Sequence, residues 1–142
     1  MLLSCSTSTP ETADEKIKLT PQQQELKDLE SRVLHIHDEV MPLMGSLIVL
    51  KEKVENLNKE LESSGTDEAA DQVIINDMII NNLDQAHESM MSWMRNYEPV
   101  DLDQDSQENM RYLQEELEKI NSIKEMTDNA ISAAEETLSS VD

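Results

Sequence analysis

The side chains best suited to chemistry form a motif of one histidine and two methionines that occurs twice. The copies cover residues 37–44 and 87–94, and both read His-[Asp/Glu]-x-x-Met-x-x-Met. Positions i, i+4 and i+7 of an α-helix share a face, so each copy would present an imidazole and two thioethers in a row. These ligand types favour a soft ion such as Cu(I). The candidate ligands are His37, Met41, Met44, His87, Met90, Met91 and Met94.

Four neighbouring residues could support such a metal site without binding the ion. Asp38 and Glu88 each follow a histidine and could accept a hydrogen bond from its second ring nitrogen. Trp93 precedes Met94 and could cover a bound cation with its ring. Met110, on a third helix, would complete the surroundings. Thioethers bind metal without losing a proton, which suits a compartment outside the cytoplasm.

A second interpretation needs no metal. Methionine commonly fills gaps in the cores of helical bundles, and a methionine stripe at helical spacing is more often core than ligand. The cluster would then belong to a non-enzymatic structural or partner-binding bundle. A methionine-rich groove that binds a partner helix is a related alternative.

Long helices must position these residues. From Leu26 to Leu61 apolar residues recur at alternating steps of three and four, a heptad pattern, and a second apolar stripe runs beside it. A helix with two apolar stripes needs two neighbours. Capping patterns predict helices at about 21–63, 67–97 and 105–139. Short connections favour antiparallel neighbours, so we expect an all-α, up-down-up antiparallel three-helix bundle of long, coiled-coil-like helices over residues 20–142.

The expected hairpins bring the two motifs together head to tail. With a turn near residue 65, His37 lies level with Met94 and Met44 with His87. A second turn near residue 102 brings Met110 level with Met94. The same height would hold Trp93 and two tyrosines, Tyr97 and Tyr112, which are all the aromatic residues of the chain.

Composition excludes several classes of function. The 142 residues include 31 Asp and Glu against 11 Lys and Arg, a net charge of −20. Nucleic-acid binding is therefore not expected, because neutralising phosphates needs basic residues. Two glycines and three aromatic residues argue against a β-sandwich or barrel. The sequence offers no nucleophile with a base and no glycine-rich phosphate loop, so an enzyme is not expected.

The N-terminal residues Leu2-Leu3-Ser4-Cys5 resemble the end of a bacterial lipoprotein signal peptide, in which the cysteine is lipidated. Residues 1–19 would then be this lipoprotein-like start and a flexible, disordered tether, with Cys5 as the anchor to a membrane. With the two His-Met segments, the chain resembles small helical lipoproteins of Bacteroidetes-type bacteria that often carry an inclusion-protein label. The resemblance implies a helical lipoprotein of the cell envelope, facing the periplasm or the surface, and it brings no settled activity.

These patterns together predict an acidic envelope lipoprotein that binds a soft metal ion, Cu(I), between its first two helices. The expected partners are a membrane, through the lipid, and a second copy of the chain or another helical protein.

Overall fold

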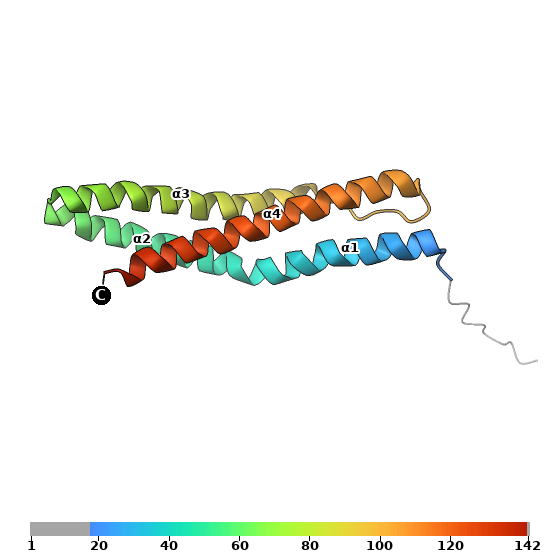
Figure 1. Cartoon of the computed structure of the whole chain (residues 1–142), viewed down its shortest axis with the longest axis horizontal. Coiled ribbons are helices and arrows are strands. Elements are labelled where there is room, and N and C mark those ends of the chain that lie inside the picture. Colours follow the sequence, from blue (N-terminus) through green and yellow to red (C-terminus); the bar gives the residue numbers. More distant parts are fainter. Residues whose placement is uncertain (1–17, 142) are drawn as a thin grey trace, which may run out of the picture.

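The computed structural model describes residues 18–141, in which all regular structure is helical (Figure 1). The all-α prediction is confirmed for these residues. Helix α1 spans Pro21–Val40, a 3₁₀ turn η1 spans Met41–Leu43, and α2 spans Met44–Ser64. Helix α3 spans Asp67–Asn96 and α4 spans Ser106–Ser139.

Local sequence signals set the helix ends. Thr20 and Gln23 form a reciprocal capping box at the start of α1. Side-chain oxygens of Thr66 and Asp105 accept hydrogen bonds from the first-turn amides of α3 and α4. Gly65 ends α2 with φ of 66°, a left-handed conformation that glycine adopts without steric cost.

Pro42 interrupts the expected first helix. Proline lacks an amide hydrogen and its ring clashes with the preceding turn, so Met41–Leu43 tighten into a 3₁₀ turn instead of continuing as α-helix. The flanking residues Val40 and Met44 keep right-handed helical angles. The chain therefore passes from α1 into α2 without reversing direction (Figure 1).

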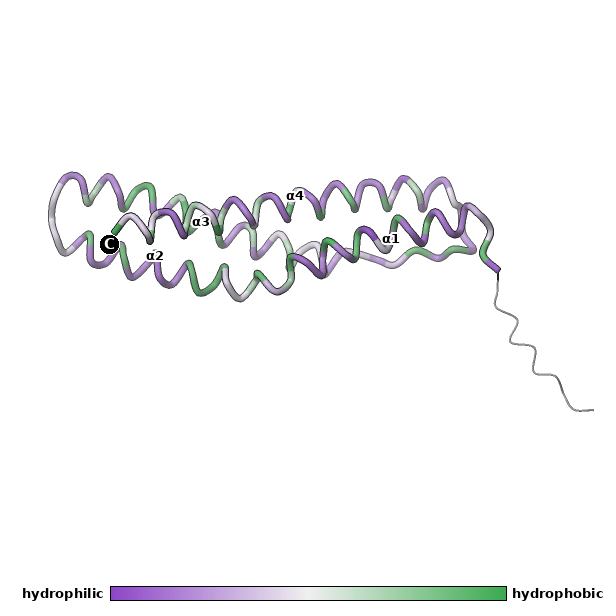
Figure 2. Tube along the Cα trace, turned by 60° about the horizontal axis from the view of Figure 1, so that its bottom comes forward, coloured by the Kyte–Doolittle hydropathy of each residue, from purple (hydrophilic) through white to green (hydrophobic). Residues whose placement is uncertain are grey.

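The helices share one long core. Helix α2 packs on α3, while α4 packs on α1, α2 and α3. Figure 1 shows α3 ending part-way along the molecule, from where the connecting segment continues beside α1 to the end at which α1 begins. Apolar and polar residues alternate along every helix (Figure 2). The main core cluster runs from Val33 to Ala134, and a smaller cluster around Leu26, Leu29 and Leu113 lies where α1 and α4 begin.

Buried polar side chains link three helices inside this core. The Asn76 amide donates to Asn58 Oδ1 at 2.8 Å, and Asn76 Oδ1 accepts from the Thr137 hydroxyl at 2.8 Å. The Gln72 amide donates to both Asn76 and Thr137. Because an unpaired buried amide is costly, this network favours one register of α2, α3 and α4.

Part of the first helical stretch, Pro21–Ser64, is apolar. It contains an 18-residue window of mean hydropathy 1.4, of which 28% is buried. By length and composition this window could cross a membrane, and the core helix of a soluble protein meets the same criterion. Here the stretch packs against α3 and α4.

Candidate methionine–histidine site

The first motif copy lies at the junction of α1, η1 and α2. His37 is half-buried, and its Nδ1 lies 3.0 Å from Asp38 Oδ1. An ionised carboxylate only accepts hydrogen bonds, so Nδ1 is the donor atom in this contact. Asp38 thus contacts the ring at the nitrogen nearer the backbone. Met41 is half-buried in the 3₁₀ turn, and Met44 is buried.

The second copy lies on regular α-helix and differs in detail. His87 is half-buried, and no hydrogen bond among residues 18–141 involves its ring. Glu88 bonds the Arg95 guanidinium instead, so the expectation that it orients His87 is wrong. A guanidinium is always charged and offers several donors, which makes it a stronger partner for an exposed carboxylate than a neutral imidazole.

Four of the predicted ligands share the main core cluster. Met44 and Met90 are buried members, and Met41 and Met91 pack against the cluster with part of their surface exposed. Met94 is 41% exposed and lies outside it. Four thioethers, two from each copy, thus pack in one cluster, and Met41, Met91 and Met94 are partly open to solvent. We call these three residues with His37 the sulfur seam.

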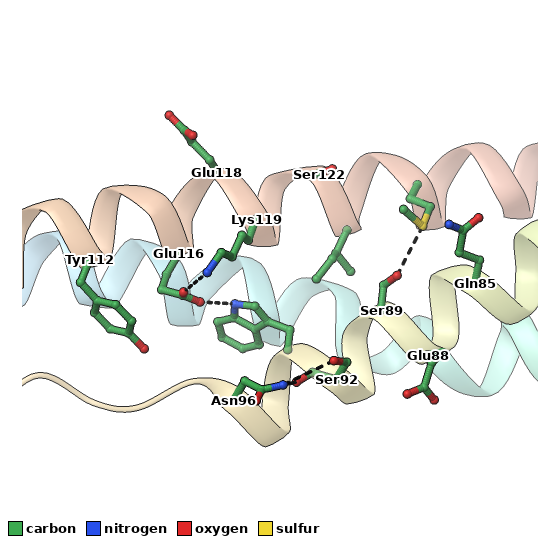
Figure 3. Close-up of a pocket in the computed structure, with 13 residues that line it drawn as sticks. Gln85, Glu88, Ser89, Ser92, Asn96, Tyr112, Glu116, Glu118, Lys119 and Ser122 are labelled. Carbon is green, nitrogen blue, oxygen red and sulfur yellow. Dashed lines mark hydrogen bonds and ion pairs between the residues drawn. The ribbon is translucent and has the colours of Figure 1, made fainter.

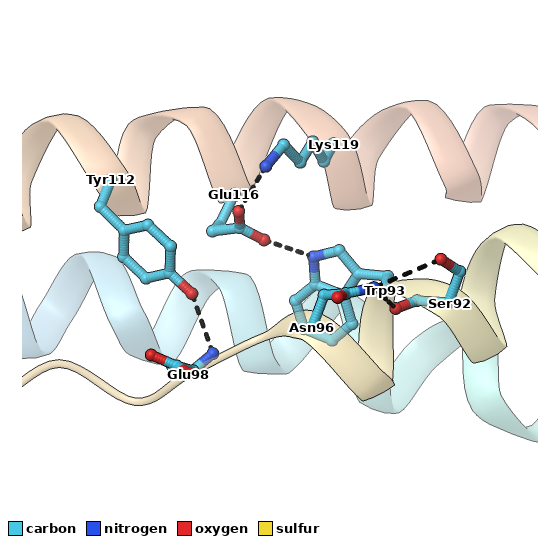
Figure 4. A network of polar contacts seen from close by, with 7 residues as sticks. All are labelled: Ser92, Trp93, Asn96, Glu98, Tyr112, Glu116 and Lys119. Carbon is cyan, nitrogen blue, oxygen red and sulfur yellow. Dashed lines mark hydrogen bonds and ion pairs between the residues drawn. The ribbon is translucent and has the colours of Figure 1, made fainter.

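Trp93 takes part in a stack of aromatic rings. Its ring lies 5.7 Å from the His37 ring and stacks at 4.8 Å on Tyr97, which in turn lies 6.2 Å from Tyr112. Its indole N–H donates to Glu116 Oε2 at 2.8 Å (Figure 4). The predicted gathering of Trp93, Tyr97 and Tyr112 is confirmed. The indole packs beside His37 as part of this stack.

Two carboxylates hold the aromatic stack in place. The buried Glu116 also accepts from Lys119 Nζ at 2.7 Å, and this hydrogen bond raises the pKa of Lys119 (Figure 4). Glu30 accepts from the Tyr97 hydroxyl and from the Val100 amide, each at 3.1 Å. Burial raises the pKa of the Tyr97 hydroxyl, and the nearby Glu30 charge raises it further.

The position expected for Met110 is wrong. Met110 packs with Leu26, Leu29 and Leu113 in the smaller core cluster, and it lines a surface hollow beside Pro21. The cause is the connection between α3 and α4. Tyr97, which follows the last residue of α3, has an extended conformation with φ −69° and ψ 131°. The chain then runs beside α1 before α4 begins (Figure 1). Helix α4 therefore starts beyond the end of α3, and Met110 lies beyond Met94.

The two motif histidines, His37 and His87, lie at different heights along the molecule. His37 packs on Trp93, and His87 precedes Trp93 by six residues, which is about 9 Å along α3. This head-to-tail order follows the sequence prediction. The two motif histidines are therefore separated along the molecule.

The carboxylate and histidine side chains of residues 18–141 form no group of three that could hold a metal ion. A site in this part of the chain would depend on sulfur. The predicted anchor Cys5 lies outside the described residues. No protein-family model, no curated protein and no solved structure matches this chain.

Proposed function

We propose that this chain is a non-enzymatic helical module that binds a soft metal ion, Cu(I), at the sulfur seam. The observation that carries the proposal is the pairing of an oriented imidazole with nearby thioethers. His37 Nδ1 lies 3.0 Å from Asp38 Oδ1, and a proton held there would leave Nε2 as the ligand atom. Met41 in the 3₁₀ turn and Met91 on α3 both pack against the main core cluster and remain partly open to solvent, so an ion could reach their sulfur atoms.

Sulfur and imidazole ligands decide the class of ion. Thioethers are soft and neutral, and they bind Cu(I) in preference to Mg²⁺ or Ca²⁺. We place the ion nearest His37, Met41, Met91 and Met94, and we give His87 and the buried Met44 and Met90 supporting roles.

Anaerobic titration with Cu(I), followed by thermal unfolding, tests this function. Cu(I) should raise the melting temperature, since a ligand at a hundred times its Kd stabilises a protein by about 2.7 kcal/mol. The Met41→Leu, Met91→Leu double variant should lose most of that shift. A control, Met110→Leu, makes the same kind of change outside the seam and should keep it. An unchanged wild-type melting temperature, or equal losses in both variants, would refute Cu(I) binding at this seam.

The second candidate function is a structural or partner-binding bundle in which the methionines are plain core. It is favoured by Met44 and Met90, whose side chains are buried among aliphatic residues. Failure of the Cu(I) titration would support it.

We further propose that the helices form an up-down-up antiparallel bundle carried on the cell envelope by an acyl group on Cys5. Support for the arrangement comes from the packing of α2 on α3 and of α4 on the other helices. Support for the anchor comes from the Leu-Leu-Ser-Cys sequence alone. Mass spectrometry of protein extracted from membranes should detect the acyl group, and an unmodified Cys5 would contradict the anchor.

A further inference from the structure

The outer face of α3 carries no charge over several turns, although the chain has a net charge of −20. Between Gln72 and His87 the only acidic or basic residues are Asp77 and Asp84. Both interact with α2: Asp77 accepts from the Asn58 amide at 2.9 Å, and Asp84 accepts from Lys51 Nζ at 2.8 Å. Asp77 and Asp84 are exposed, but they lie on the side of α3 that turns toward α2. The other exposed residues of this stretch are uncharged: Ile74, Ile75, Met78, Asn81, Asn82 and Gln85.

One end of this face is an apolar protrusion. Ile74, Ile75 and Met78 are each more than half exposed and lie within one helical turn of each other. A large apolar group gains about 1.5–3 kcal/mol when it is fully buried, so three neighbouring exposed ones favour a partner that covers them. We call these three residues the knob.

The other end of the same face opens into a groove between α3 and α4 (Figure 3). The groove has a volume of about 1050 Å³ and begins at Gln85, the last residue of the uncharged face. Helix α3 contributes small polar side chains such as Ser89 and Ser92, and α4 contributes the apolar side chains of Ile123 and Met126 beside polar and charged ones. The charged residues at the groove are Glu88, Glu116, Glu118 and Lys119. Glu88 is paired with Arg95, and Glu116 with Lys119.

We propose that two copies of this chain associate through this face as an antiparallel, two-fold symmetric dimer, with the knob of each copy in the groove of the other. Knob and groove lie on one helix on either side of residues 81–85, so an antiparallel pair centred there matches both at once. In this register Met78 lies level with Ser89 of the second copy. Asp71 lies level with Asn96 of the second copy.

The matching positions of knob and groove and the available area favour a second copy as the occupant. Two chains of −20 repel each other, and association on the uncharged face keeps most carboxylates apart. The face from residue 71 to 96 is about 40 Å long and, with the groove, buries on the order of 600 Å² per copy, the lower end of specific interfaces. We therefore expect a reversible dimer that strengthens as salt screens the remaining repulsion.

Sedimentation velocity of the full chain under reducing conditions tests the dimer. Wild type should sediment as twice 16.2 kDa at micromolar concentration. Ile74→Glu should weaken association about a hundredfold, because each copy would bury an unpaired carboxylate in the groove of the other. The matched control is Ile48→Glu on α2, since Ile48 and Ile74 are similarly exposed, at 57% and 62%. It should remain dimeric, and circular dichroism should show the same helicity for both variants.

A cysteine pair tests the register independently. In a Cys5→Ser background, Met78→Cys with Ser89→Cys should form a covalent dimer on mild oxidation. Within one chain these positions are about 16 Å apart along α3, too far for an internal disulfide. Met78→Cys with Asn96→Cys, one heptad out of register, should cross-link poorly. Equal cross-linking of both pairs, a monomeric wild type, or a dimer indifferent to Ile74→Glu would each overturn the proposal; a monomer that binds another helical protein would assign the face to that protein.

Discussion

The two copies of the His-Met motif have the same pattern and different surroundings. In the first copy His37 is held by Asp38 and by the Trp93 ring, and its backbone is tightened at Pro42. In the second copy the backbone is regular α-helix, and the acidic residue after His87 bonds Arg95. The ring of His37 therefore contacts a carboxylate and an indole, whereas the ring of His87 makes no hydrogen bond within residues 18–141.

This difference teaches that a repeated motif does not imply repeated chemistry. The spacing of histidine and methionine places the side chains on one face, but the partners that orient them come from elsewhere. Trp93 belongs to the second copy and packs against the histidine of the first. The two copies thus contribute different parts. The first supplies the imidazole of His37, and the second supplies the Trp93 ring that packs against it.

Replacing Trp93 should cause the largest predicted loss of stability. Trp93→Ala removes a buried ring stacked between His37 and Tyr97, and it takes the indole donor from the buried Glu116. We expect the free energy of unfolding to fall by about 3–5 kcal/mol, measured by urea denaturation with circular dichroism. Trp93→Phe keeps an aromatic ring and should cost less. A loss below about 1 kcal/mol for Trp93→Ala would show that the stack does not support the first copy.

Two methionines of the second copy should differ sharply in their contribution to stability. Met90 is 0% exposed and Met94 is 41% exposed. Met90→Ala leaves a cavity in the main core and should cost about 2–4 kcal/mol, whereas Met94→Ala should cost less than about 1 kcal/mol. Urea denaturation of the two variants side by side measures both values. Similar losses would contradict the division of this copy into a core methionine and a seam methionine.

The parts of the fold that the sequence predicts correctly are those set by local signals. The heptad pattern, the capping residues Thr20, Thr66 and Asp105, and Gly65 each act within a few residues, so they can be read directly from the chain. The segment between α3 and α4 is different. Its extended path depends on tertiary contacts, such as the hydrogen bond from the Val100 amide to Glu30, and no periodicity encodes these. The position predicted for Met110 is wrong for that reason.

The candidate site shows the same limit. Membership of Met41, Met44, Met90 and Met91 in one cluster follows from the predicted hairpin. The roles of Glu30 and Glu116 were missed, because a buried carboxylate looks like any other acidic residue in a chain with so many. Glu116 occupies a heptad-compatible position three residues after the buried Leu113, and that spacing was the one available signal.

The smallest predicted effect tests the difference between the two acidic neighbours directly. Asp38→Ala removes the acceptor that holds His37 Nδ1–H and should weaken Cu(I) binding about tenfold, as loss of an outer hydrogen bond to a metal-binding histidine commonly does. Glu88→Ala, an equally exposed control, should leave the affinity unchanged because Glu88 does not contact His87.

Competition titration with Cu(I) measures both affinities, and nitrogen NMR of the histidine rings reports the cause. Without Asp38 the neutral His37 ring is free to carry its proton on Nε2, so its nitrogen shifts should move toward that tautomer, while those of His87 stay unchanged in the Glu88→Ala chain. A loss of affinity with unchanged nitrogen shifts would mean that Asp38 acts through its charge and not by orienting the ring. Equal effects of the two substitutions would remove the distinction between the two copies.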